Sequence, residues 1–261
     1  MNIRHSQLKE FIMIFTDQDL QVLTNFSEIN QNFIFKKGKT AMTISTMKNI
    51  LAHYEMESEV PKEFGIYDLK DFLNVYDLFD KPKLTITDDK IILKDNRFTS
   101  DYHPTETHIL VAPKKSPNNT LFNNEIEFDY KFKLSANDIK DYHSARRHSD
   151  KLPDLTIETK EGYPCFKLQD LKSNTNTKLS FILNSSDQNK TNHQYNFEMK
   201  CENFNRILIG DYHAELREPR EDKKSGGVIK LTCLNIPLHY WIALEPKPQP
   251  DSKEREDKVN A

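Results

Sequence analysis

The sequence has few of the residues that catalytic and metal-binding motifs require. It contains only six glycines, and no P-loop, GxGxxG, HExxH or GxSxG pattern occurs in it. Cys165, Cys201 and Cys233 form no CxxC pair, so we expect three buried reduced thiols instead of a zinc site. These absences argue against an enzyme, and we expect neither a cofactor nor a metal ion.

Long apolar runs are absent as well. No stretch of about 18 apolar residues, the length that spans a bilayer, is present. The first residues also lack the apolar core of a signal peptide. The sequence therefore predicts a soluble protein in a reducing compartment, with no membrane partner.

The charge balance of the chain is slightly acidic. The formal net charge is -3, with 30% charged and 36% hydrophobic residues. Because a protein that reads DNA sequence is usually basic on at least one face, this charge argues against tight binding of nucleic acid but leaves room for a local basic stripe. Sixteen Phe and ten Tyr supply apolar bulk to the core in few positions.

Local patterns predict many short strands and four helices. The helices are expected at residues 17–29, 68–79, 135–148 and 198–208, where apolar side chains recur at helical spacing. Alternating runs predict strands at residues 32–35, 40–44, 83–87, 90–94, 108–111, 128–134, 156–159, 165–169, 178–183, 212–216, 227–233 and 240–244. Asp88-Asp89 and Glu161-Gly162 are typical of hairpin turns, and residues 185–193 and 217–227 of polar loops.

The order of these elements is similar in the two halves of the chain. We expect an α+β protein with two similar domains, residues 13–113 and 128–246, each with two helices on antiparallel sheet. Residues 114–127 form a polar connector that docks on the surface. Residues 1–12 form an N-terminal extension, and residues 247–261 are a charged, proline-rich tail that we expect to be disordered.

A positive stripe is predicted along the third helix. At about 100° per residue, Lys140, Ser144, Arg147 and Lys151 fall within a narrow angular band. Cations spaced in this way contact successive phosphates without reading bases, and we add the neighbouring Arg146 to this DNA-facing set. The alternative interpretation is an ordinary solvated helix face.

The other predicted helices carry fewer cations. Lys70 lies on the second helix, Lys81 follows its end, and Arg206 lies on the short fourth helix, whereas the first helix exposes Asp17 and Glu28 and no cation. We therefore expect weak, salt-sensitive contact with DNA, made mainly by the second half.

Two catalytic alternatives are weaker. Asp88-Asp89 is compatible with a metal site, but a hairpin turn is the favoured interpretation. A hydrolase would have to use His143 and Asp138, which would need an oriented partner and a pocket.

Several ordered segments together resemble a known family. They are residues 33–36 (Phe-Ile-Phe-Lys) with Gly38, 66–69 (Ile-Tyr-Asp-Leu) leading into Phe72-Leu73, 111–114, 136–139 followed by Arg147, and 240–245. In this order and at these spacings, over roughly residues 13–246, the chain resembles the sliding clamps of T-even-type bacteriophages.

This resemblance implies the DNA-clamp fold and a role as a processivity factor. Three subunits would close head to tail into a homotrimeric ring, with helices lining the pore around duplex DNA and sheets outside. An ATP-dependent clamp loader would open the ring, a DNA polymerase would be tethered by it, and the cytoplasm of the infected bacterial host would be its location. Partner peptides would enter an apolar cleft, for which we name Val111, Pro113, Phe122, Leu244 and Pro246.

The charge of the first helix departs from the pattern that the resemblance implies, because clamp helices usually carry cations there. We therefore expect the DNA-facing charge mainly on the second domain. A separate alternative function is a monomeric viral polymerase accessory protein that grips DNA without closing a ring.

Overall fold

The same order of elements occurs twice along the chain. The computed structural model describes residues 10–113, 127–173, 177–183, 189–219 and 226–246. Within these residues the first half contains β1 (Phe11–Met13), α1 (Asp17–Ile29), β2 (Phe33–Phe35), β3 (Gly38–Ile44), β4 (Ile50–Val60), β5 (Phe64–Ile66), α2 (Leu69–Tyr76), β6 (Lys83–Ile86), β7 (Ile91–Lys94) and β8 (Thr99–Tyr102). The second half contains β9 (Tyr130–Leu134), α3 (Ala136–His148), β10 (Asp154–Lys160), β11 (Tyr163–Gln169), β12 (Leu179–Ile182), β13 (Asn196–Lys200), α4 (Cys201–Phe204), β14 (Tyr212–Arg217), β15 (Val228–Cys233) and β16 (Leu238–Ala243).

The long helices of the two halves begin in the same way. Both α1 and α3 have 13 residues and start with a capping box. In α1, Thr16 Oγ1 accepts from the amide of Asp19 at 3.1 Å, and the Asp19 carboxylate accepts from the amide of Thr16. Ser135 and Asp138 repeat this exchange at α3. A capping box satisfies amides that a helix end leaves without partners, so both helices are fixed at equivalent positions.

Sheet order repeats along with element order. The sheet β1-β6-β7-β8 of the first half corresponds to the strands β9-β14-β15-β16 of the second half. The first-half pairs β4-β3 and β2-β5 correspond, in the same order, to the second-half sheet β12-β11-β10-β13. The two halves join where β16 pairs antiparallel with β4, from Leu238 opposite Tyr54 to Ile242 opposite Ile50. The result is one sheet, β3-β4-β16-β15-β14-β9, that runs through both halves.

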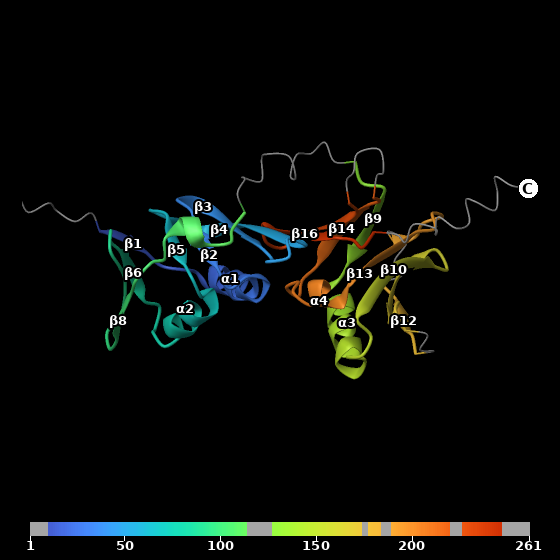
Figure 1. Cartoon of the computed structure of the whole chain (residues 1–261), viewed down its shortest axis with the longest axis horizontal. Helices are drawn as coiled ribbons and strands as arrows, with labels where there is room; N and C mark the ends of the chain where they lie inside the picture. The colour runs from blue at the N-terminus through green and yellow to red at the C-terminus, as the bar shows by residue number, and fades with distance from the viewer. Residues whose placement is uncertain (1–9, 114–126, 174–176, 184–188, 220–225, 247–261) are drawn as a thin grey trace, which may run out of the picture.

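All four helices lie on one side of this continuous sheet (Figure 1). On that side the halves are also joined by hydrogen bonds. Asn25 Nδ2 donates to the carbonyl of Arg206 at 2.9 Å and accepts from the Tyr240 hydroxyl at 2.6 Å through its Oδ1. Arg206 donates to the carbonyl of Ile29 at 3.0 Å, and Asn49 donates to Asn203 at 3.0 Å. The junction is therefore stabilised both by the β16–β4 pairing within the sheet and by these hydrogen bonds on the helix side.

Aromatic side chains fill much of the core. In the second half Tyr142 is fully buried and packs against Phe204 and Phe166, with ring centroids 4.8 and 6.0 Å away. The Tyr142 hydroxyl lies 2.8 Å from Asn205 Oδ1 and 3.1 Å from the carbonyl of Cys201. Large rings bury much apolar area per residue, which lets a chain with 36% hydrophobic residues form a continuous core.

The predicted elements agree best where local signals are strong. α1 has the predicted bounds, and α3 begins after its predicted cap, Ser135. The hairpin turns are confirmed, since Asp88-Asp89 lies between β6 and β7 and Glu161-Gly162 has positive φ at both residues. All three cysteines are free, although Cys233 is only partly buried.

Three predictions of local structure are corrected. The helix expected over residues 198–208 is reduced to α4, because Phe197 and Met199 alternate inward in β13, which pairs with β10. Residues 108–111 form no strand and follow a short 3-10 turn at Thr107–Ile109. The second helix ends at Tyr76, before the predicted residue 79.

Several strands were not predicted at all. These are β1, β4, β5, β8 and β13, and β4, with 11 residues, is the longest strand of the described chain. β1 begins at Phe11, within the expected extension of residues 1–12, and pairs with β6.

Some predictions fall on segments that lie outside the described residues. These segments are nearly all of the connector 114–127, including Phe122, the tail 247–261, and parts of the loops 185–193 and 217–227. Among the described helices, none has both the length and the apolar character needed to cross a membrane.

Candidate nucleic-acid interface

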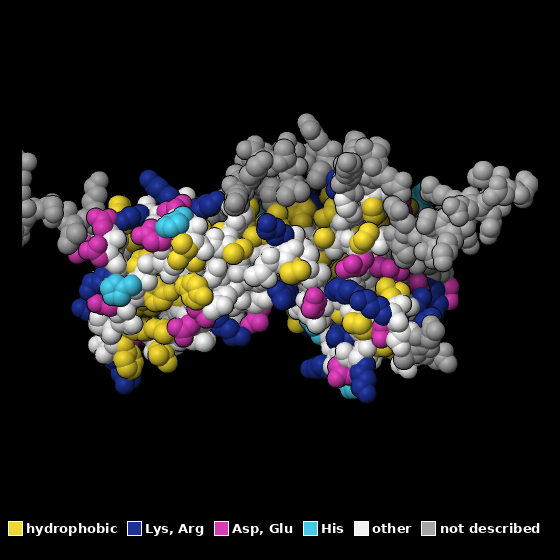
Figure 2. Space-filling model, in the orientation of Figure 1, with side chains coloured by type: hydrophobic (Ala, Val, Ile, Leu, Met, Phe, Trp, Pro, Cys, Tyr) yellow, Lys and Arg dark blue, Asp and Glu magenta, His cyan; other side chains and the backbone are white. Residues whose placement is uncertain are grey.

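The basic face of α3 is exposed on the helix side of the molecule. Lys140 and Arg147 are exposed, and Ser144 between them is partly buried. Lys151 is exposed too, but α3 ends at His148, so Lys151 continues the stripe from the turn after the helix. Figure 2 shows Lys and Arg side chains gathered at the lower right, where α3 lies.

A hollow joins this face to the segment that follows α4. Its volume is about 600 Å³, and it is lined by Lys140, His143, Arg146, Arg147, Asn205 and Ile209. No lining residue is acidic. Burial, and secondarily the charge of Arg147, lowers the pKa of His143, so that imidazole is neutral near pH 7 and the positive charge comes from the lysine and the arginines. Guanidinium and ammonium groups placed in this way suit phosphate oxygens.

Two of the predicted DNA-facing arginines also hold the fold. Arg146 Nη1 donates to the carbonyls of Ser149 and Leu152, at 2.8 and 2.6 Å, and so ties down the C-terminal end of α3. Arg206 bridges the halves through the carbonyl of Ile29. Both side chains are partly buried, so their guanidinium groups are less free for a ligand than those of fully exposed residues.

The helices of the first half present a different charge. Asp17 and Glu28 are exposed on α1, and Lys70 of α2 pairs with Glu28 at 2.7 Å. Lys81 is exposed beyond α2. The first half therefore has fewer predicted DNA-facing cations than the second half, and the charge of one of them, Lys70, is balanced by Glu28.

Four of the candidate residues of the partner cleft, Val111, Pro113, Leu244 and Pro246, are described and lie near one end of the junction between the halves, whereas Phe122 lies outside the described residues. Asn30 Nδ2 donates to the carbonyls of Ile44 and Val111, at 2.9 and 2.8 Å, which places Val111 beside the end of β3. Asn49, in the turn between β3 and β4, accepts from the amide of Ala243, which precedes Leu244.

These cleft residues differ in exposure. Val111 is 40% exposed, whereas Leu244 is 7% exposed and packs against Gly227. Pro113 is partly buried and Pro246 is exposed. Leu244 thus offers little open surface, and Val111 and Pro246 offer more.

The residues considered for catalysis have structural partners. Asp138 belongs to the capping box of α3, five residues before His143. Asp88 pairs with Lys62 beside the β6–β7 turn. No cluster of three or more His, Cys, Asp or Glu side chains suited to a metal occurs within the described residues.

Sequence patterns missed Asn205 and Ile209 of the hollow. A helix expected over residues 198–208 gave no reason to place them beside α3. The signal that could have helped is the alternation of Phe197 and Met199, which continues a strand to Lys200 and delays the start of the helix to Cys201; the turn after this short helix then lines the hollow together with Arg146.

Comparison with known proteins agrees with this fold. Residues 18–106 match the family model described as DNA polymerase processivity factor. A sliding clamp of Vibrio phage KVP40 is 24% identical over 229 residues, which are 87% of this chain and 96% of that relative. A sliding clamp of Escherichia phage RB69 is 28% identical over 98 residues, 37% of this chain and 43% of that relative.

Solved structures extend the likeness to the whole fold. The structure of A. fulgidus PCNA bound to the C-terminal region of FEN-1 has a TM-score of 0.62 and 11% identity, and the match covers 92% of this chain and 100% of that chain. The resemblance to clamps of T-even-type phages and the expected DNA-clamp fold are thus confirmed. The chain thus resembles DNA polymerase processivity factors over residues 18–106 and a phage sliding clamp over most of its length.

Proposed function

We propose that three copies of this chain close head to tail into a ring around duplex DNA and so tether a DNA polymerase. The observation that carries the proposal is the junction between the two halves. Within the chain β16, the last strand of the second half, pairs with β4, the third strand after α1. By element order, β16 of the second half corresponds to β8 of the first half, and β4 of the first half corresponds to β12 of the second half.

Both equivalent strands have an open edge. Among the described residues, β8 pairs only with β7 and β12 only with β11, so each is the outer strand of its sheet. They belong to opposite halves and lie toward opposite ends of the molecule (Figure 1). Exposed strand edges are usually covered or paired. Pairing β8 of one copy with β12 of the next would repeat the internal junction, and a repeated heterologous contact closes into a ring when the rotation from one copy to the next is a whole fraction of a turn.

Side chains on β12 support this use of its edge. Leu179 and Ile182 are 37% and 38% exposed although both are large and apolar. The edge of β9, in contrast, is occupied, because the Asn189 side chain accepts from the amide of Lys133 at 2.7 Å and donates to its carbonyl at 2.9 Å. β9 is therefore unsuited to pairing with a second copy along this stretch.

DNA would lie on the helix side of such a ring. Lys140, Arg147 and Lys151 would face phosphates there, with Arg146 and Arg206 behind them and Lys70 and Lys81 as weaker contacts. Contacts to phosphates alone are independent of sequence and sensitive to salt. A tether that must slide needs only this modest attraction.

Partners would dock at the end of the junction near Val111, Pro113, Leu244 and Pro246, and we propose that Phe122, which lies outside the described residues, belongs to the same cleft. The A. fulgidus relative binds the C-terminal region of FEN-1. By analogy a DNA polymerase would insert a peptide with apolar anchors, and a clamp-loading ATPase would open the ring. The phage origin of the relatives supports the cytoplasm of an infected bacterial cell as the proposed location.

Release from DNA ends tests encirclement directly. Fluorescent chain would be loaded onto a nicked circular duplex and onto the same duplex after linearisation, and the amount retained would be followed over time. We expect stable retention on the circle and rapid loss from the linear form, because a ring slides off free ends. Equal retention on both would favour the monomeric accessory protein that grips DNA without closing.

A further inference from the structure

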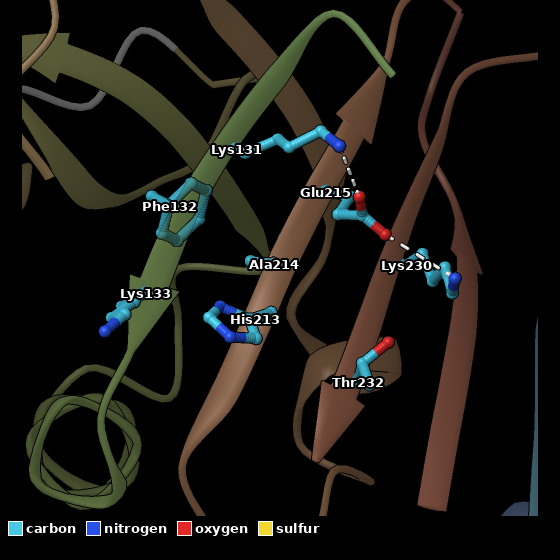
Figure 3. A pocket seen from close by; sticks show the side chains of 8 residues that line it. All are labelled: Lys131, Phe132, Lys133, His213, Ala214, Glu215, Lys230 and Thr232. Atoms are coloured by element: carbon cyan, nitrogen blue, oxygen red, sulfur yellow. Dashed lines mark ion pairs between the residues drawn. The ribbon is translucent and has the colours of Figure 1, made fainter. Parts of the chain in front are cut away.

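A second hollow lies on the sheet side of the second half, opposite the helices. Its volume is about 460 Å³, and strands β9, β14 and β15 form it (Figure 3). Phe132 and Ala214 are buried and point toward the core, so the side chains that alternate with them point outward. The outward set is Lys131, Lys133, His213, Glu215, Lys230 and Thr232.

One row across the strands contains a shared carboxylate. Glu215 lies between Lys131 and Lys230 and contacts them at 2.9 and 3.5 Å (Figure 3). Burial acts to raise the pKa of Glu215, but the hydrogen bond from Lys131 and the charge of Lys230 outweigh it and lower that pKa. Glu215 is therefore ionised, and this row carries one negative charge against two positive charges.

The next row lacks an acidic group. Lys133 lies opposite His213, and His213 lies opposite Thr232. No acidic side chain of the described residues pairs with the Lys133 ammonium group, which is exposed. The hollow as a whole thus holds three lysines and one carboxylate, an excess of positive charge on a chain whose net charge is -3.

The backbone below Lys133 is fixed. The Asn189 amide bonds both the amide and the carbonyl of Lys133, and Asn189 is 3% exposed. This contact covers the edge of β9 where a partner strand would otherwise add. A ligand here would be recognised by the side chains in the hollow and not by extension of the sheet.

We propose that this sheet-side hollow binds an acidic segment of a partner protein. A partner carboxylate would lie against Lys133, with the His213 ring of the neighbouring strand beside it and Thr232 one strand farther on. An apolar side chain of the partner, next to that carboxylate, would cover the aliphatic parts of the lysine side chains that line the hollow. Hydrogen bonds between charged groups are the stronger kind, so one such contact would dominate the affinity.

A protein partner fits the charges better than nucleic acid does. A nucleic acid brings a continuous row of phosphates, and one of them would meet the Glu215 carboxylate. An acidic segment can place a single carboxylate and follow it with an apolar residue. The hollow and the basic face of α3 also lie on opposite sides of the domain, so both can be occupied together.

A labelled peptide of alternating aspartate and leucine residues would serve as the probe, with a lysine–leucine peptide as its comparison. Fluorescence anisotropy would be measured with the full chain, Lys133→Glu, Lys133→Gln and Lys160→Glu. Lys160 is exposed at the end of β10 and does not line the hollow, so Lys160→Glu makes the same charge change elsewhere. Lys133 is exposed and points outward, so its replacement should leave the fold intact.

We expect the acidic peptide alone to bind, with affinity reduced about tenfold or more by Lys133→Glu and less by Lys133→Gln. Lys160→Glu should stay within about twofold, because exposed charges at a distance are screened. Equal weakening by Lys133→Glu and Lys160→Glu would overturn the proposal, as would equal binding of the lysine peptide. Displacement of the peptide from the Lys133 side by duplex DNA would assign the hollow to nucleic acid instead.

Discussion

The two halves of the chain share a framework but differ in the charge of their helix faces. α1 and α3 have the same length and the same capping box. Yet α1 exposes Asp17 and Glu28, whereas α3 exposes Lys140 and Arg147. Caps and buried side chains set where a helix lies, while exposed positions are free to change. Repetition of a fold therefore does not imply repetition of a binding surface.

The halves differ again at their sheet edges. β4 of the first half pairs with β16 of the second half, whereas its counterpart β12 pairs only with β11 among the described residues. Likewise β16 of the second half pairs with β4 of the first half, whereas its counterpart β8 pairs only with β7 among the described residues. One junction is thus already made inside the chain, and we propose that its equivalent is made with a second copy.

The largest expected difference between the halves is in the stability lost when the capping-box aspartate, Asp19 or Asp138, is replaced. Asp19 is fully buried and also accepts from the Tyr54 hydroxyl and the amides of Glu57 and Ser58. Asp19→Ala should lower the free energy of unfolding by about 3 kcal/mol, because it leaves several buried donors without partners. Asp138→Ala should cost about 1 kcal/mol, as loss of a cap does. Urea denaturation would measure both, and equal losses would contradict the distinction.

The junction between the halves should weaken in acid. His53 and His239 lie opposite each other on β4 and β16, with ring centroids 5.9 Å apart. Burial, then the charges of His53 and Lys230, lowers the pKa of His239 from 6.5 to about 4. Burial also lowers the pKa of His53, although Glu55 opposes it.

A lowered histidine pKa means that the unfolded chain binds the proton first. The stability from this pair is therefore complete above about pH 6.5 and is lost as the pH falls toward 4. We expect a loss of about 2 kcal/mol for His239, after allowing for its partial exposure. Thermal unfolding of the chain and of His239→Asn across this range would measure it. An unchanged pH slope in His239→Asn would contradict the assignment.

The smallest effect concerns the charge of the helix faces. Lys140→Glu combined with Arg147→Glu should weaken clamp-dependent DNA synthesis several-fold without unfolding the protein, and by a larger factor at low salt than at high salt, because the attraction to phosphate that is lost is itself weakened by salt. The matched pair Asp17→Lys and Glu28→Lys in α1 should preserve or strengthen it. Primer extension over a series of salt concentrations would compare them. Loss of synthesis in the α1 pair alone would place the DNA contact in the first half.

Local signals in the sequence were enough for the capped helices. Thr16 and Ser135 precede regular apolar spacing, and α1 and α3 form as predicted. β4 was missed although Ile50, Ala52 and Tyr54 alternate inward and β3 pairs beside it, because the partner on its other edge, β16, lies far along the chain. The same reason explains why residues 196–200 form β13 and not the predicted helix.

The candidate site was predictable in charge but not in detail. Lys140 and Arg147 could be placed on one face from helical spacing alone. That Arg146 and Arg206 donate to backbone carbonyls depends on where distant segments lie, which no local pattern contains. The basic hollow on the sheet side was missed although Lys131 and Lys133 alternate with buried residues in β9.

Oligomer mass tests the central claim, that β8 and β12 repeat the internal junction between copies. Light scattering after size-exclusion chromatography would be applied to the chain, to Ile182→Glu in β12 and to Leu234→Glu, an equally drastic change at a residue 46% exposed outside both edges. We predict a trimer for the chain and for Leu234→Glu, and a monomer for Ile182→Glu. A chain that stays monomeric at high concentration, or a trimer that Ile182→Glu leaves intact, would contradict the account.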